Sequence, residues 1–230
     1  MNFDDDRWRA IFESATEAFV EVSGRIGPAQ WNEPGLGAWT LRDLVGHTSR
    51  ALLTIELYLA RDAEPITLDS PVAYLLAAGA STGSTLGAEA IAQRGRDAGT
   101  ALGNEPAAAV AVIADRIMSL VDRTADDAPC ATPAGAIALA AYLPTRAFEL
   151  TVHTLDIASA IGTAPPEGLG EPVRACLDLA AAAIGVTPSE RSDGGVKSSV
   201  TGSDAEPGAP VASTPMIAIV WSPSVSLPVT

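Results

Sequence analysis

The chain has 230 residues, of which 28 are acidic and 14 basic, so its formal net charge is −14 at pH 7. This excess of acid disfavours binding to nucleic acid and to anionic membranes, since both need clustered Lys and Arg side chains. Small molecules are the expected partners, and the length suits one domain with or without an appendage.

The N-terminus and the cysteines favour a cytoplasmic protein. The first residues, MNFDDDRWRAIF, lack the basic and apolar regions of a secretory signal. No apolar run reaches the ~18 residues that a transmembrane helix needs. Cys130 and Cys176 have no CxxC spacing, so we expect two buried thiols rather than a disulfide. We expect a monomer or a homodimer.

The first predicted helix starts near the acidic run Asp4–Asp6, whose charge suits the positive end of a helix dipole. Gly27 and Pro28 end it. Its apolar residues recur at steps of three and four and form one stripe: Trp8, Ile11, Phe12, Ala15, Phe19, Val22 and Ile26.

A second helix is predicted from Thr40 to about Arg61. Thr40 and Asp43 resemble a capping box with Asp in place of the usual Glu. Trp31 and Trp39 precede this helix, and packing at its entrance is the favoured role over stacking on a ligand.

The remaining elements are also mainly helical. We expect a short helix near residues 72–78 and longer ones over about 86–102 and 106–125, whereas residues 129–146 fit either an extended segment or a helix. Pro144 is expected in the first turn of a helix that stops at Gly162, and the last helix follows Pro172 and ends near Gly185. The pattern predicts an all-α antiparallel four-helix bundle with extra short helices.

Residues 1–186 are expected to form this bundle, and residues 187–230 a non-helical C-terminal tail. The tail is rich in Ser, Gly, Pro and Asp, which is typical of a linker. It ends in one β-prone segment, MIAIVWSPSVSLPVT.

The two histidines of the chain, His47 and His153, both fall on predicted core-facing helix positions. Arg146, Glu149, His153 and Asp156 follow one another at steps of three, four and three, so they share one helix face. Two imidazoles and a carboxylate suit zinc or another divalent metal and leave a coordination position open. From the spacing alone, a hydrogen-bonded core histidine is the alternative.

Two segments carry a family resemblance. GLGAWTLRDLVGHTSRALL (residues 35–53) and TRAFELTVHTLDIASAIG (residues 145–162) resemble two helices of the DinB-like, mycothiol-dependent maleylpyruvate isomerase family. In that family the first reads T-[VL]-x-D-L-[VL]-x-H after a Trp, and the second reads E-x-x-x-H-x-x-D-[LI]. The resemblance covers roughly residues 5–186. It implies a DinB-like bundle that holds a divalent metal, usually zinc, through His47, Glu149 and His153.

The resemblance also implies a reaction class. Mycothiol or a similar low-molecular-weight thiol would act as cosubstrate and attack a small electrophile, as in an isomerase or an S-transferase. A metal-dependent hydrolase on the same bundle, and a non-catalytic metal-binding or regulatory protein, are the alternatives. Residues 187–230 do not resemble the sterol-carrier-like second domain of the isomerase and are expected to be truncated or divergent, which leaves the reaction itself open.

Each of two further residues has a functional and a structural interpretation. Arg146 is a candidate catalytic residue that holds a carboxylate of the substrate or thiol, or it is structural, as a salt bridge to Glu149 or a surface charge. Asp156 orients His153, or it caps a neighbouring element.

Overall fold

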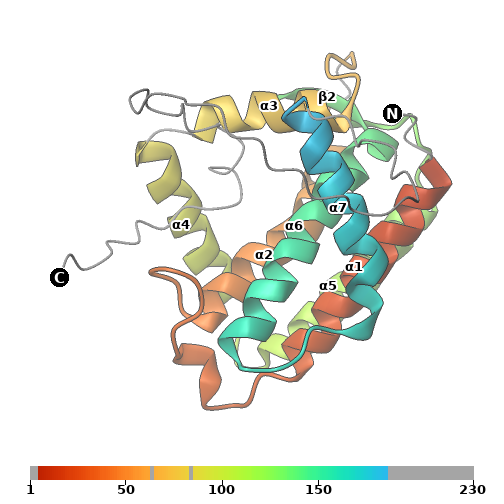
Figure 1. Ribbon diagram of the computed structural model, residues 1–230. Coiled ribbons are helices and arrows are strands. Elements are labelled where there is room, and N and C mark those ends of the chain that lie inside the picture. Colours follow the sequence, from red (N-terminus) through yellow and green to blue (C-terminus); the bar gives the residue numbers. More distant parts are fainter. Residues whose placement is uncertain (1–4, 63–64, 83–84, 186–230) are drawn as a thin grey trace, which may run out of the picture.

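The structure, a computed structural model, describes residues 5–62, 65–82 and 85–185. Seven α-helices and one small two-stranded sheet make up this part of the chain (Figure 1). The predicted tail, residues 187–230, lies outside the described residues. The elements are α1 (Asp5–Gly24), η1 (Gln30–Asn32), α2 (Leu41–Leu59), α3 (Pro71–Thr82), α4 (Thr85–Ala101), α5 (Pro106–Asp122), β1 (Pro129–Thr132), β2 (Gly135–Ala138), α6 (Leu139–Ala160), η2 (Glu167–Leu169) and α7 (Gly170–Ala183).

Four of the helices form the predicted bundle. α1 and α2 each pack against both α5 and α6, while α4 covers α2 and α7 covers α6 (Figure 1). None of the helices within the described ranges is both long and apolar enough to cross a membrane. The stripe predicted for the first helix is buried along its whole length and forms part of the core, although α1 ends at Gly24, before its last member: Trp8, Ile11, Phe12, Ala15, Phe19, Val22 and Ile26.

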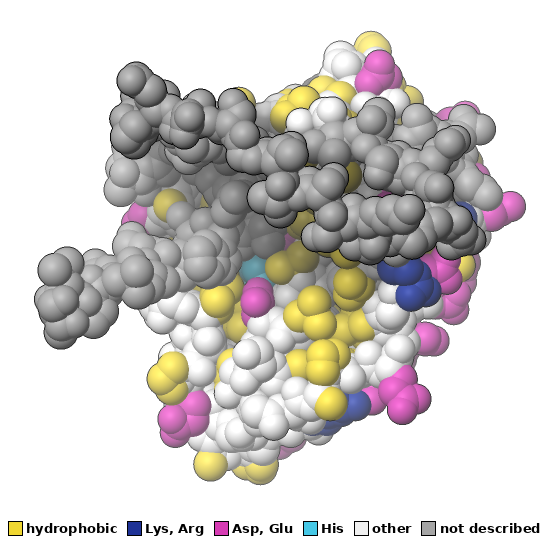
Figure 2. Space-filling view, in the orientation of Figure 1, with side chains coloured by type: hydrophobic (Ala, Val, Ile, Leu, Met, Phe, Trp, Pro, Cys, Tyr) yellow, Lys and Arg dark blue, Asp and Glu magenta, His cyan; other side chains and the backbone are white. Residues whose placement is uncertain are grey.

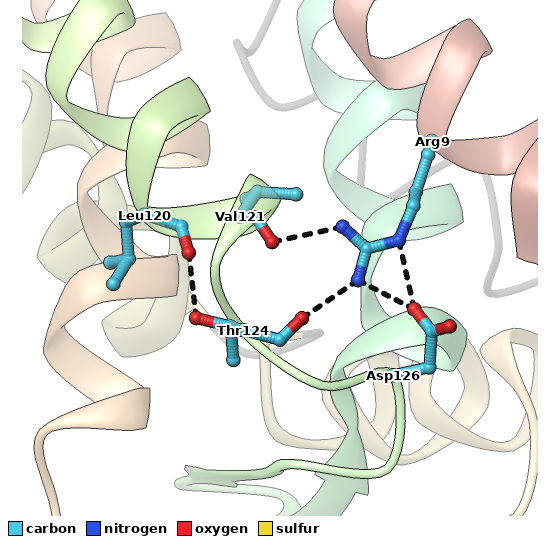
Figure 3. Close-up of polar contacts among 5 residues, drawn as sticks. All are labelled: Arg9, Leu120, Val121, Thr124 and Asp126. Atoms are coloured by element: carbon cyan, nitrogen blue, oxygen red, sulfur yellow. Dashed lines mark hydrogen bonds and ion pairs between the residues drawn. The ribbon is translucent and has the colours of Figure 1, made fainter.

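An arginine fixes α1 against the end of α5 (Figure 3). The guanidinium of Arg9 donates hydrogen bonds to the carbonyl oxygens of Val121 and Thr124, at 2.9 and 3.0 Å. Its Nε and Nη2 atoms both donate to Oδ1 of Asp126, at 2.8 and 2.5 Å. These carbonyls belong to the last turn of a helix and the residues after it, where helical partners are lacking. The contact therefore sets how α1 and α5 align.

The predicted capping box at the start of α2 is confirmed. The backbone N–H of Asp43 donates to Oγ1 of Thr40 at 3.2 Å, and the N–H of Thr40 donates to the Asp43 carboxylate at 3.1 Å. A reciprocal cap defines the first turn of the helix. It thereby fixes the direction in which the side chain of His47 projects from α2.

The segment before α6 is a β-hairpin, and the predicted place of Pro144 is wrong. β1 and β2 pair antiparallel, and α6 begins at Leu139, so Pro144 lies inside the helix. The N–H groups of Leu139 and Ala140 bind the carbonyls of Ala128 and Asp126, so the loop supplies partners for the early start of the helix. A proline inside a helix costs about 3 kcal/mol. The adjacent side chains of Tyr142, Leu143 and Thr145 are completely buried, and this burial offsets that cost.

Two other helices bear on the site. α3 is longer than the short helix predicted near residues 72–78. α4 follows its predicted course and approaches α2 closely, because Gly46 faces Gly99 across the contact.

Candidate metal centre

His47 of α2 and Glu149 and His153 of α6 converge at one point between the two helices. Oε2 of Glu149 lies 3.4 Å from Nε2 of His153 and 3.9 Å from Nε2 of His47. One ligand atom from each residue lies within 4.8 Å of the other two. The predicted residues are thus brought together, close enough for one ion to contact all three.

The hydrogen-bond pattern of the triad fits a divalent cation. Nδ1 of His153 lies 3.0 Å from Oδ2 of Asp156, so Nδ1 carries the proton and Nε2 faces the triad. Nε2 of His153 and Nδ1 of His47 are buried and have no hydrogen-bond partner in the described part of the chain. A buried imidazole nitrogen without a partner is costly. Coordination would satisfy Nε2 of His153, and two nitrogens with one carboxylate suit zinc.

The electrostatics of the triad favour a carboxylate and at least one neutral imidazole. Burial, together with repulsion from His153, lowers the pKa of His47 to about 3. Burial works to raise the pKa of Glu149, but His153 and Arg146 outweigh it and hold the pKa at about 2. Burial also works to lower the pKa of His153, and the carboxylates of Asp156 and Glu149 outweigh it and raise the pKa to about 9. A metal ion would therefore have to displace a proton from His153.

The triad lies at the wall of a cavity of about 160 Å³. The side chain of His153 is only 2% exposed, whereas those of Glu149 and His47 are 13% and 18% exposed and line the cavity. On the face drawn in Figure 2, a histidine side chain is visible between hydrophobic side chains and a carboxylate. The ring of Trp39 lies 4.6 Å from that of His47, and its Nε1 donates to the carbonyl of Ala92. Trp39 thus packs at the start of α2, as predicted, and it also contacts α4 and covers one side of His47.

Arg146 is buried beside the triad and lines the same cavity. Its guanidinium carbon lies 4.7 Å from the ring centre of Tyr142 and 5.6 Å from that of Tyr74, and its Nε donates to Oγ1 of Thr145. The salt bridge to Glu149 that the spacing also allowed is not formed. The catalytic role of Arg146 stays a prediction, which its position next to the cavity favours.

Sequence reasoning missed several other residues of the cavity wall. Arg50, Thr54 and Tyr58 continue the α2 face of His47 at steps of three and four, and that periodicity was the signal available for them. Arg94 and Tyr74 come from α4 and α3, and no sequence pattern connects these helices to the triad.

The comparisons with known proteins agree with the family resemblance. The model of the mycothiol maleylpyruvate isomerase N-terminal domain matches residues 12–158, which include all three residues of the triad. No curated protein and no solved structure matches the chain. Because the match spans more than half of the sequence, the chain belongs to the mycothiol maleylpyruvate isomerase N-terminal domain family.

Proposed function

We propose that the chain is a zinc-dependent enzyme that activates a low-molecular-weight thiol, such as mycothiol, for attack on a small electrophile. The observation that carries this proposal is the triad of His47, Glu149 and His153 at the wall of a cavity. Membership of the family supports mycothiol as the thiol.

The residues of the site have distinct tasks in this proposal. His47, Glu149 and His153 hold the ion, and Asp156 keeps the proton of His153 on Nδ1 so that Nε2 stays free to ligate. A divalent cation bound there lowers the pKa of a thiol and keeps it as the nucleophilic thiolate. Arg146 contacts the substrate from the cavity wall.

The cysteines of the chain support a nucleophile supplied from outside. Cys130 and Cys176 are both free and buried, as predicted. Burial raises the pKa of each thiol to about 12, so neither is a thiolate near neutral pH. A thiol cosubstrate therefore supplies the nucleophile, and we place the protein in the cytoplasm, where such thiols stay reduced.

Metal analysis tests the site, and a thiol-dependence assay tests the reaction. Wild-type protein should hold one zinc per chain, and His47→Ala and His153→Ala should hold little, while the exposed control Glu171→Ala should match wild type. Stoichiometric metal in both histidine variants would refute the site.

Turnover should require both metal and added mycothiol, measured with a panel of conjugated and alkylating electrophiles. The product separates the two reactions of the family, since a transferase releases the thiol adduct and an isomerase releases the rearranged substrate. Turnover of a hydrolysable substrate without any thiol would instead indicate hydrolysis by metal-activated water and contradict the proposal.

A further inference from the structure

The cavity beside the triad gathers positive charge in a chain whose net charge is −14. Arg50 of α2, Arg94 of α4 and Arg146 of α6 all line it. Within residues 5–62, 65–82 and 85–185, none of these three forms an ion pair with a carboxylate. Other arginines of the described chain do form such pairs: Arg7, Arg9, Arg25, Arg96 and Arg116.

Arg146 is the most deeply placed of the three. It is 9% exposed, and the faces of Tyr142 and Tyr74 provide contacts that stabilise its charge. A guanidinium has five N–H donors, and in the described residues only the Nε–H has a hydrogen-bond acceptor. A buried cation with unpaired N–H donors beside a cavity is incompletely satisfied. It forms no ion pair at contact distance with a carboxylate of the described chain.

Arg50 and Arg94 add positive charge at less buried positions of the cavity wall. Arg50 is half-buried and Arg94 is exposed. Burial, followed by repulsion from Arg94, lowers the pKa of Arg50. An anion near both guanidinium groups would relieve this repulsion.

The polar wall of the cavity combines two kinds of group. Among the described residues Glu149 supplies the only carboxylate of the lining, and it lies at the triad together with His47. The rest of the polar wall consists of the arginines, three tyrosines and Thr54, and the hydroxyl of Tyr142 donates to Thr54 at 3.1 Å. A volume of about 160 Å³ suits a ligand about the size of benzene.

We propose that Arg50, Arg94 and Arg146 form an oxyanion-binding subsite that takes the carboxylate of a small organic acid and directs the other end of the molecule toward the triad. Guanidinium groups bind carboxylates through paired, charge-assisted hydrogen bonds, and a site with several of them discriminates strongly against neutral ligands. As a description of the substrate this inference rests on the proposed function, whereas carboxylate binding itself does not.

Calorimetric titration of the full chain, with its metal content measured, tests the subsite. The probes are benzoate, its neutral counterpart benzamide, and inorganic phosphate. The variants are Arg50→Gln, Arg94→Gln and Arg146→Lys. The last of these keeps the positive charge but removes the planar guanidinium that can bind a carboxylate through two hydrogen bonds. Arg96→Gln is the matched control, because it removes the same charge from α4 at a position that pairs with Glu89 outside the cavity.

Benzoate should bind, and benzamide should bind at least about tenfold more weakly. Arg50→Gln and Arg146→Lys should each weaken benzoate binding by about tenfold or more at unchanged metal content. Arg94→Gln should weaken it severalfold, and Arg96→Gln should leave it unchanged.

Three results would overturn the inference. The first is that benzoate and benzamide bind equally well. The second is that Arg50→Gln and Arg146→Lys both bind benzoate with wild-type affinity. The third is that Arg94→Gln and Arg96→Gln lose the same amount of benzoate affinity. Phosphate binding tighter than benzoate would also contradict a carboxylate ligand and indicate a site for inorganic oxyanions. Because the titration needs neither thiol nor turnover, its failure is distinct from failure of the proposed function.

Discussion

The contact between α2 and α4 gives a sharp test of how the site is assembled. A β-carbon placed on Gly46 would lie 2.1 Å from the backbone nitrogen of Gly99 and 2.4 Å from its α-carbon. Both neighbours are main-chain atoms, so no side-chain rotation can make room. We therefore expect Gly46→Ala to push α4 away from α2.

The size of the effect follows from these distances. An ordinary van der Waals contact begins at 3.4 Å, so α4 must move by about 1.3 Å at this point. Overpacking of a well-packed contact costs about 1–3 kcal/mol, and a clash between two backbones belongs at the upper end of that range. For a chain of this size, about 3 kcal/mol lowers the melting temperature by about 6–12 °C.

Thermal unfolding followed by circular dichroism in excess chelator measures this loss without a contribution from metal at the adjacent His47. Gly24→Ala is the control, because a β-carbon there meets no atom within 4 Å and its backbone is not in the left-handed region. We expect this control to be neutral or stabilising by about 0.4–1 kcal/mol. A Gly46→Ala melting temperature equal to that of Gly24→Ala would show that α4 does not approach α2 in this way.

Four other predictions concern the triad and the thiols. Asp156→Asn should weaken zinc affinity by about 10–100-fold in a chelator competition, while Glu171→Gln, which removes the same charge at the surface, should not. Zinc uptake at pH 7 should release about one proton, from His153, as measured by calorimetry in buffers of different ionisation enthalpy. The raised pKa of His153 stabilises the metal-free fold fully below the ordinary value of 6.5, so the chelated protein should lose stability as pH rises from there through about 9, and constant stability would contradict this. Cys130 and Cys176 should react with iodoacetamide only on unfolding, and rapid labelling of the native chain, detected by mass spectrometry, would contradict their burial.

Much of the fold was predictable because local signals and tertiary packing agree. The stripe of α1 and the capping box at Thr40 are local patterns, and both are present as predicted. The start of α6 was not predictable, because a proline usually marks a first turn. Hydrogen bonds from Leu139 and Ala140 to the residues before the hairpin override that preference, and no pattern in the sequence of α6 reveals them.

The candidate site was likewise predictable only in part. Glu149, His153 and Asp156 share one helix face, so their proximity follows from helical geometry alone. The position of His47 beside them needs the packing of α2 on α6, which the family resemblance supplied. Arg94 reaches the cavity only because α4 lies close against α2, and this depends on two glycines more than fifty positions apart. A contact between two such distant glycines produces no periodic pattern in the sequence.

The arginine cluster also limits what the net charge of the chain can exclude. An extended polyanion contacts a wide protein surface, so a charge of −14 opposes its binding. A small anion inside the cavity is in contact with the guanidinium groups instead, and acidic side chains farther away than about 8 Å are largely screened at physiological ionic strength. Arg50 and Arg146 lie at the cavity where the ligand binds, and neither forms an ion pair with a carboxylate in the described chain. The acidic exterior that disfavours nucleic acid is therefore compatible with an anionic substrate.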